Sequence, residues 1–324
     1  MSINLDTAMS LLKDYRYNYA KGLFRAAVRK IVGRDKYTLK KYNGNPILSL
    51  QSANDLIRES IESDKPFMAG RFGDGELRSI VCYLNRCVGM SKTYPDYIRT
   101  AITRNAGVFP GTDDTIDKFA ELMIKSCHST DILAVWFNFM EDYIYNKFGP
   151  TKQTCVYLKS LEPFWFDRPW TEALSGKRVL VIHPFEETIR SQYDKKTHLF
   201  SNPNILPEFE LLTLKAVQTI GGNSERFSNW FEAFDWMYSQ AMGMDFDIAL
   251  IGCGAYGFPL AAKIKSSGKM AIHLGGVTQM LFGIKGGRWD NRPDYAALYN
   301  EYWCRPSEKE RPNIALQIEN ACYW

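Results

Sequence analysis

The second half of this 324-residue chain alternates between short apolar runs and amphipathic segments, and this alternation constrains the fold more than any other feature. Apolar runs predict buried strands, and the segments between them carry apolar residues at helical spacing. Strands that alternate with helices form a mainly parallel sheet, because each helix returns the chain to the same edge. We therefore expect an α/β, Rossmann-like fold, with a mainly parallel sheet and helices on both faces. The predicted strands are 177–184, 210–214, 248–251 and 270–274, and the predicted helices are 186–193, 230–242 and 259–267.

The first half contains further elements of the same kinds. It predicts strands at 66–70, 131–137 and 154–158 and helices at 48–64, 76–84 and 94–107. The turn cluster Asn-Gly-Asn-Pro at 43–46 marks a boundary before them. We therefore divide the chain into a basic amphipathic helical segment (1–45), an α/β domain (46–290) and a C-terminal extension (291–324).

A short acidic motif lies where the strand at 66–70 meets the next helix. Arg71 and Gly73 precede two carboxylates, Asp74 and Glu76. Paired carboxylates are hard oxygen ligands for Mg²⁺ or Mn²⁺, the arginine suits phosphate, and the glycine lets the backbone approach a ligand. A structural alternative stays open, because Asp-Gly is a common turn and acidic residues favour the first turn of a helix.

A glycine-rich loop follows the strand at 248–251. Gly252, Gly254 and Gly257, with Tyr256 between them, fit the pattern G-x-G-x-x-G before a helix. Such a loop offers backbone amides and a helix N-terminus to an anion. The pattern also predicts a dinucleotide, but no acid occurs between 248 and 289 to hold the adenosine ribose. Tight packing between strand and helix is the structural alternative.

Two histidines and two glutamates complete the candidate site residues. His183 and His273 lie at the ends of predicted strands, where a histidine can donate to phosphate or act as a base. Glu186 and Glu187 begin the next helix, and either can be the base that deprotonates an acceptor hydroxyl. Their structural alternatives are a locally hydrogen-bonded histidine and a favourable charge in the first helical turn.

The acidic motif, followed far downstream by the glycine loop, resembles bacterial glycosyltransferases with the GT-D fold. The resemblance runs from about residue 63 to 287 and rests on Arg-Phe-Gly-Asp-Gly-Glu at 71–76 and on 246–276. It implies a glycosyltransferase in which Asp74 and Glu76 bind Mn²⁺ or Mg²⁺. It implies further that Arg71, Gly73, the loop of Gly252, Gly254, Tyr256 and Gly257, and His273 bind a nucleotide sugar, which we expect to be UDP-linked.

The same resemblance implies an acceptor glycan of a bacterial surface polysaccharide or glycoprotein, linked to lipid or protein. Two other functions stay open: a Rossmann-type enzyme that uses NAD or S-adenosylmethionine, and a non-catalytic scaffold of a polysaccharide-assembly complex. Either would retain the α/β fold, since a fold does not determine function. We expect no nucleic-acid partner.

The distribution of charge and cysteine along the sequence indicates where in the cell the protein acts. Residues 1–45 carry a net charge of +7, whereas the rest carries −3 of the total of +4. Apolar residues at helical spacing among these bases predict either a helix on an anionic membrane or one packed on its own domain. The seven cysteines form no disulfide framework, and no signal peptide is recognisable. We therefore expect a cytoplasmic protein. Peripheral contact with the inner face of the cell membrane is an alternative that stays open.

Overall fold

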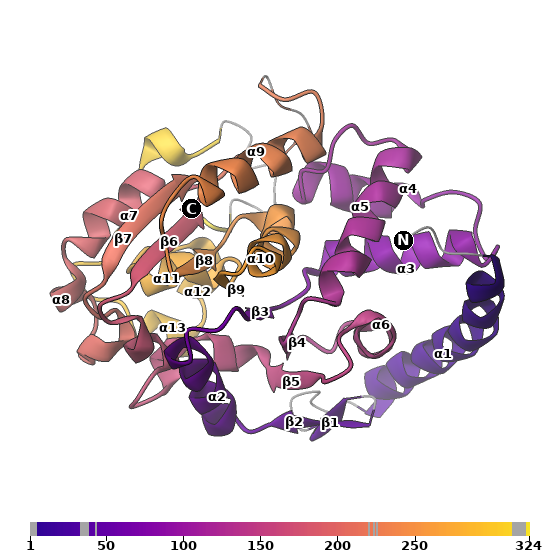
Figure 1. Cartoon of the computed structure of the whole chain (residues 1–324), viewed down its shortest axis with the longest axis horizontal. Coiled ribbons are helices and arrows are strands. Elements are labelled where there is room, and N and C mark those ends of the chain that lie inside the picture. The colour runs from indigo at the N-terminus through magenta and orange to yellow at the C-terminus, as the bar shows by residue number, and fades with distance from the viewer. Residues whose placement is uncertain are drawn as a thin grey trace.

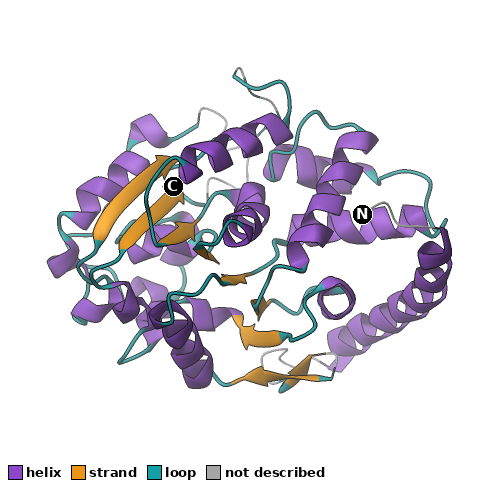
Figure 2. Ribbon diagram, viewed as in Figure 1, coloured by secondary structure: helices purple, strands orange, loops and turns teal. Residues whose placement is uncertain are grey.

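A nine-stranded sheet forms the centre of the computed structural model, which describes residues 5–32, 39–42, 44–219, 221–222, 224, 226–312 and 322–324. The strand order is β1-β2-β5-β4-β3-β9-β8-β6-β7 (Figures 1 and 2). Only β1 and β2 pair antiparallel, and every other neighbouring pair is parallel. The expected fold class is therefore confirmed. The strands are β1 Lys41–Tyr42, β2 Asn45–Leu48, β3 Met68–Gly70, β4 Ile132–Val135, β5 Thr154–Tyr157, β6 Arg178–His183, β7 Glu210–Lys215, β8 Ile248–Ile251 and β9 Met270–His273.

Helices cover both faces of the sheet. Strand β6 shows why, because Leu180 and Ile182 join one buried cluster while Val179 and Val181 join another. Successive side chains of a strand point to opposite faces, so an apolar run needs a covering layer on each. On the first face lie α3 (Asp74–Cys87), α5 (Asp113–Cys127), α6 (Glu141–Phe148), α9 (Trp230–Met242) and α10 (Gly257–Ser266), and on the second α2 (Leu50–Glu62), α7 (Glu186–Tyr193), α8 (Lys196–Leu199), α11 (Val277–Leu281), α12 (Gly287–Asp290) and α13 (Pro293–Ala296).

The predicted elements recur with small shifts at their ends. Helix α3 begins two residues earlier than predicted, because Gly73 is an extended N-cap (φ −77°, ψ 154°) and Asp74 already belongs to the first turn. The helix predicted at 94–107 divides into α4 (Asp96–Thr100) and a π-helical turn at Ala101–Asn105. Helices α5 and α6 were missed, although their amphipathic patterns are ordinary.

Described residues on both sides of 46–290 pack on this sheet or its helices. Of the turn cluster, Asn45 and Pro46 begin β2, which pairs with β5, and Asn43 lies outside the described residues. Beyond residue 290, Tyr295 and Trp303 are buried in the second cluster. Within the described residues, no two of the seven cysteines are joined in a disulfide. Among the described residues, no helix is long and apolar enough to cross a membrane.

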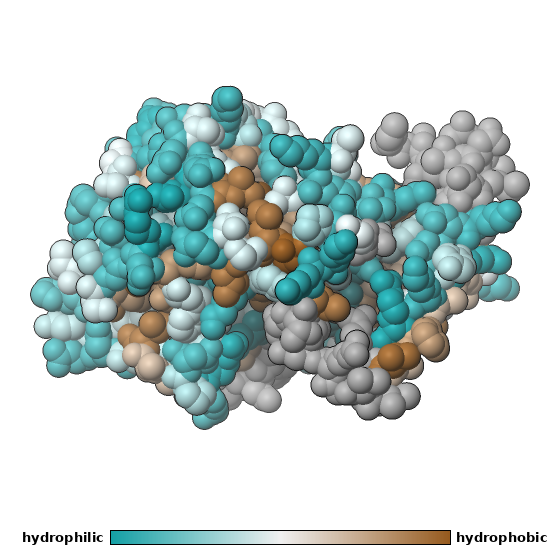
Figure 3. Space-filling view, turned by 90° about the horizontal axis from the view of Figure 1, so that it is seen from below, coloured by the Kyte–Doolittle hydropathy of each residue, from teal (hydrophilic) through white to brown (hydrophobic). Residues whose placement is uncertain are grey.

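The N-terminal helix α1 (Leu5–Val32) packs on α3 and α6 along one side. The Tyr15 hydroxyl donates to the Val81 carbonyl (3.0 Å), and Arg25 pairs with Asp142 (2.7 Å). On another side, Tyr17 and Phe24 are 68% and 70% exposed. In Figure 3, apolar residues interrupt the hydrophilic surface at the end of the molecule where α1 lies. The helix thus packs on its own domain, as one alternative expects, and still exposes apolar side chains. The membrane alternative stays a prediction.

Candidate functional site

A cavity of about 470 Å³ opens at the carboxyl ends of the parallel strands. Residues that follow β3, β4, β6, β7, β8 and β9 line it, because parallel strands all end at one edge of the sheet. From β3 the chain continues to β4, toward one edge of the sheet, and from β6 it continues to β7, toward the opposite edge. Ligands of open α/β sheets bind at such reversals, and the volume suits a small organic ligand.

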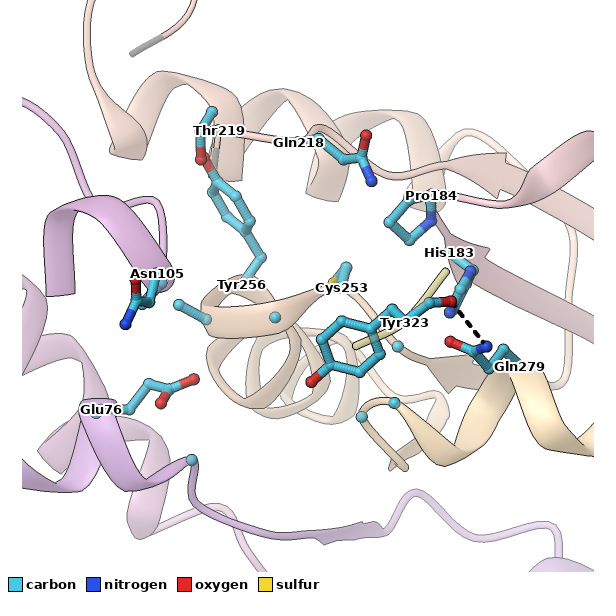
Figure 4. Close-up of a pocket in the computed structure, with 18 of the residues that line it drawn as sticks. Glu76, Asn105, His183, Pro184, Gln218, Thr219, Cys253, Tyr256, Gln279 and Tyr323 are labelled. Carbon is cyan, nitrogen blue, oxygen red and sulfur yellow. Dashed lines mark hydrogen bonds between the residues drawn. The ribbon is translucent and has the colours of Figure 1, made fainter. Parts of the chain in front are cut away.

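The acidic motif forms one wall of this cavity. Glu76 bends back over Gly73 so closely that a Cβ at that position would lie 1.9 Å from Glu76 Oε2. Glycine therefore leaves the space that the carboxylate occupies, and Figure 4 shows this carboxylate pointing inward from α3. Asp74 lies at the rim, half exposed, and pairs with Arg78 one turn along the helix (2.8 Å). The structural alternative for Asp74 is thus present, while Glu76 faces the cavity.

Arg71 supplies positive charge beside these carboxylates. Its guanidinium packs over the Trp136 ring (5.1 Å) and fills the space above Gly275, where a Cβ would lie 2.1 Å from Nη2. Gly275 also has a positive φ of +66°, which favours glycine. The arginine is thus held between an aromatic ring and a bare backbone, within the cavity lining.

The glycine loop forms the facing wall. Strand β9 lies between β3 and β8, so the acidic motif and the loop do not follow adjacent strands, yet both line the cavity. A Cβ at Gly252 would lie 2.5 Å from Thr278 Oγ1 and 2.7 Å from the Gly275 carbonyl, whereas Gly254 adopts φ +58° in open space. Close packing therefore explains the first glycine, and the turn explains the second.

Tyr256 stands within this loop but turns its hydroxyl to the protein. Its ring stacks on Trp230 (4.5 Å), and its oxygen lies 2.8 Å from Thr219 Oγ1. The side chain is 1% exposed. Tyr256 therefore shapes the wall of the cavity through its ring.

The two histidines occupy different places. His183 lines the cavity, and its Nδ1 accepts a hydrogen bond from the Phe185 amide (3.0 Å). His273 lies outside the lining, with its ring beneath Gly257. A Cβ added at Gly257 would lie 2.3 Å from the nearest atoms of that ring. Burial lowers the pKa of His183 to about 3. The pKa of His273 is also lowered to about 3, mainly by burial and to a smaller extent by the positive charge of Arg71. Both rings are neutral at pH 7, so His183 offers an Nε2–H donor and is a poor base.

Glu186 and Glu187 do not line the cavity. Glu186 accepts from Thr213 Oγ1 (2.7 Å) and pairs with Arg190 (2.9 Å), which directs it toward β7. The exposed Glu187 lies in the first turn of α7. The structure therefore separates the predicted base candidates from the acidic motif, and their assignment as bases stays a prediction.

Sequence reasoning missed several residues of the lining, among them Trp136, Gln279 and Tyr323. Trp136 directly follows β4, and this position at the carboxyl end of a strand could have marked it as a residue of the site. Gln279 and Tyr323 lie in segments with no recognisable motif. Arg288 also lines the cavity, where its guanidinium stacks on Tyr323 (4.5 Å).

A divalent cation fits the acidic wall only together with oxygen atoms of a ligand. Among the described residues, no three His, Cys, Asp or Glu side chains gather into a metal-binding group. Mg²⁺ is usually bound through one or two carboxylates plus phosphate oxygens, and Mn²⁺ shares its preference for oxygen. The cradle of Glu76 over Gly73 and the nearby carboxylate of Asp74 match that mode of binding.

The comparisons with known proteins give a limited result. No family model matches the chain, and no curated protein matches it either. One similar solved structure is a selenomethionine-substituted domain of unknown function 1792, with 12% identity and a TM-score of 0.45 over 82% of this chain and 92% of that chain. Another, described as the highly conserved domain of unknown function 1792 with a distinct glycosyltransferase fold, has 13% identity and a TM-score of 0.41 over 81% and 96%. Neither similarity identifies a ligand or a reaction for this chain.

Proposed function

We propose that the protein is a metal-dependent glycosyltransferase that uses a nucleotide sugar, with UDP as the expected nucleotide. One observation carries the proposal: the acidic wall and the glycine loop face each other across a single cavity that also contains two arginines. Carboxylates, arginines and bare backbone together suit a metal-bound diphosphate. The sequence resemblance of the same two segments to GT-D glycosyltransferases supports the same reaction class.

In this proposal each wall has a defined role. Asp74 and Glu76 hold Mn²⁺ or Mg²⁺, with Asp74 leaving Arg78 to do so. The bound cation would neutralise negative charge that develops on the leaving diphosphate. Arg71 and Arg288 donate to phosphate oxygens, and the neutral His183 donates from Nε2. The backbone of the glycine loop approaches the diphosphate closely at Gly254, where no side chain enters the open space.

The acceptor side of the reaction rests on the resemblance alone. It implies a growing bacterial glycan, linked to lipid or protein. Within the described part of the chain, no Asp or Glu side chain apart from Asp74 and Glu76 lines the cavity, so Glu186 and Glu187 stay predictions for the base that deprotonates the acceptor. The Rossmann-type alternative is weakened at β9, which ends at the buried His273 instead of an acid that could hold an adenosine ribose.

A ligand screen tests the proposal directly. The melting temperature of the protein should rise with one nucleotide sugar in the presence of Mn²⁺ and much less after chelation. Ligand at 100 times its Kd stabilises a protein by about 2.7 kcal/mol. A rise with NAD or S-adenosylmethionine instead would favour the Rossmann-type enzyme. No response to any nucleotide would favour the scaffold.

We also propose that α1 holds the enzyme on an anionic membrane, close to a lipid-linked acceptor. Tyr17, Phe24 and Val28 are exposed at helical spacing, with Lys21 between them. Apolar anchors with flanking bases bind anionic lipid, each base adding about 1 kcal/mol. We expect the protein to float with phosphatidylserine vesicles at low salt, and Phe24→Asp to float much less. Tyr97→Asp, at an exposed tyrosine of α4, is the matched control. Equal flotation of all three proteins, or none, would rule out this role of α1.

A further inference from the structure

The side-chain amide of Gln279 is buried, and its nitrogen forms hydrogen bonds while its oxygen forms none among the described residues. It lies in α11, is 0% exposed and lines the cavity. Its Nε2 donates to the carbonyls of Ile284 (3.3 Å), Lys285 (3.1 Å) and Tyr323 (3.2 Å), which fixes the orientation of the amide. Its Oε1 has no hydrogen-bond partner among the described residues. This oxygen is itself buried, and Figure 4 shows it on the side of the amide that faces Tyr323.

The segment Cys322–Trp324 forms the adjoining wall. Its backbone is held at both ends, since the Arg288 amide donates to the Cys322 carbonyl (2.8 Å) and the Gly287 amide to that of Trp324 (3.3 Å). The ring of Tyr323 lies against Gly276, where a Cβ would be 2.5 Å from Cε1. Figure 4 shows the ring between Gln279 and Glu76, within the cavity.

These contacts place an aromatic ring beside an unpaired acceptor in the cavity that contains the acidic wall. A buried acceptor without a partner costs about 1–3 kcal/mol, so a ligand that supplies a donor gains that energy. An aromatic face beside it favours a ring, either a nucleobase or the apolar face of a sugar. Both kinds of ring carry donors, N–H on the base and O–H on the sugar.

We propose that Gln279 and Tyr323 form a subsite for a ring of the nucleotide sugar. Gln279 fastens the Cys322–Trp324 segment through Nε2 and accepts a hydrogen bond from the ligand at Oε1, while the ring of Tyr323 packs on the ligand. This inference rests on the proposed function and adds to it a wall that lies far along the sequence from both motifs. The diphosphate itself does not use this subsite.

Calorimetric titration with Mn²⁺ present tests the subsite with three probes: pyrophosphate, UDP and UDP-glucose. Tyr323→Ala should weaken binding of a ring-bearing probe about tenfold more than binding of pyrophosphate, because stacking on an aromatic side chain contributes on that scale. Pyrophosphate should lose only what the Tyr323 ring contributes by supporting Arg288. Tyr323→Phe keeps the ring and should bind like the wild type. Gln279→Met should weaken binding of the same probe, and Tyr97→Ala, at an exposed residue outside the cavity lining, is the matched control.

The pattern of losses separates the two sources of the ring. Weaker binding already seen with UDP assigns the subsite to the nucleoside, and weaker binding seen only with UDP-glucose assigns it to the sugar. Unchanged binding of both by Tyr323→Ala would overturn the subsite alone, and so would tighter binding, because the segment would then compete with the ligand. If Gln279→Met does not fold, the Tyr323 pair decides. No binding of any probe by the wild type would overturn the proposed function as well.

Discussion

Glu76→Gln is expected to lower the rate of sugar transfer at least about a hundredfold while leaving the melting temperature within a few degrees of the wild type. The amide keeps the shape that fills the space over Gly73 but loses the charge that would hold the metal. Removing one group that stabilises charge in a transition state commonly costs a factor of 10² to 10³. Release of nucleoside diphosphate from the donor at saturating Mn²⁺ measures the effect.

The control for this experiment comes from a second helix. Asp114 lies in the first turn of α5 and pairs with Lys118 (2.8 Å), as Asp74 lies in the first turn of α3 and pairs with Arg78 (2.8 Å). Asp114→Asn removes the same helix-end charge and a similar surface ion pair, each a small contribution to stability. Asp74→Asn should therefore abolish transfer while Asp114→Asn does not. Wild-type turnover by Asp74→Asn and Glu76→Gln would assign both acids to helix capping.

Gly252→Ala is expected to destabilise the fold by about 3 kcal/mol and to abolish nucleotide binding. The added methyl group would meet Thr278 Oγ1, the Gly275 carbonyl and the His183 ring within 2.7 Å. Two of these contacts belong to the first turn of α11 and the loop before it, so the glycine loop and the β9–α11 connection would have to separate. Overpacking of a buried site costs about 1–3 kcal/mol, and here backbone must move. Urea unfolding measures the change.

Gly254→Ala is the matched control within the same loop. Nothing lies within 4 Å of a Cβ at that position, so only its φ of +58° opposes an alanine. The left-handed conformation costs a residue other than glycine about 1–2 kcal/mol. We therefore expect a smaller loss of stability from Gly254→Ala than from Gly252→Ala. The reverse order would mean that the contacts around Gly252 are not close-packed.

Local patterns in the sequence were sufficient for strands β3 to β9 and for two walls of the cavity, but not for the short strands β1 and β2. The run Ile248–Ile251 is apolar at every position because both faces of β8 are covered, and such runs mark buried strands without reference to neighbours. The acidic motif and the glycine loop each follow a strand directly. Since parallel strands end at one edge, their placement at the same edge followed from the alternation of strands and helices.

Only the tertiary structure decided which side chains meet there. Periodicity gives the face of an element but not its neighbours, so it left open that Glu186 pairs with Arg190 and Thr213, or that His273 lies beneath Gly257. Gln279 and Tyr323 are more than forty residues apart in the sequence and lie in segments with no motif. In the fold, Gln279 Nε2 donates a hydrogen bond to the Tyr323 carbonyl. The sequence by itself determined strands β3 to β9, their carboxyl ends and the two loops, because burial and turns are local. Long-range packing determined the rest, because it depends on shapes that only the folded chain brings into contact.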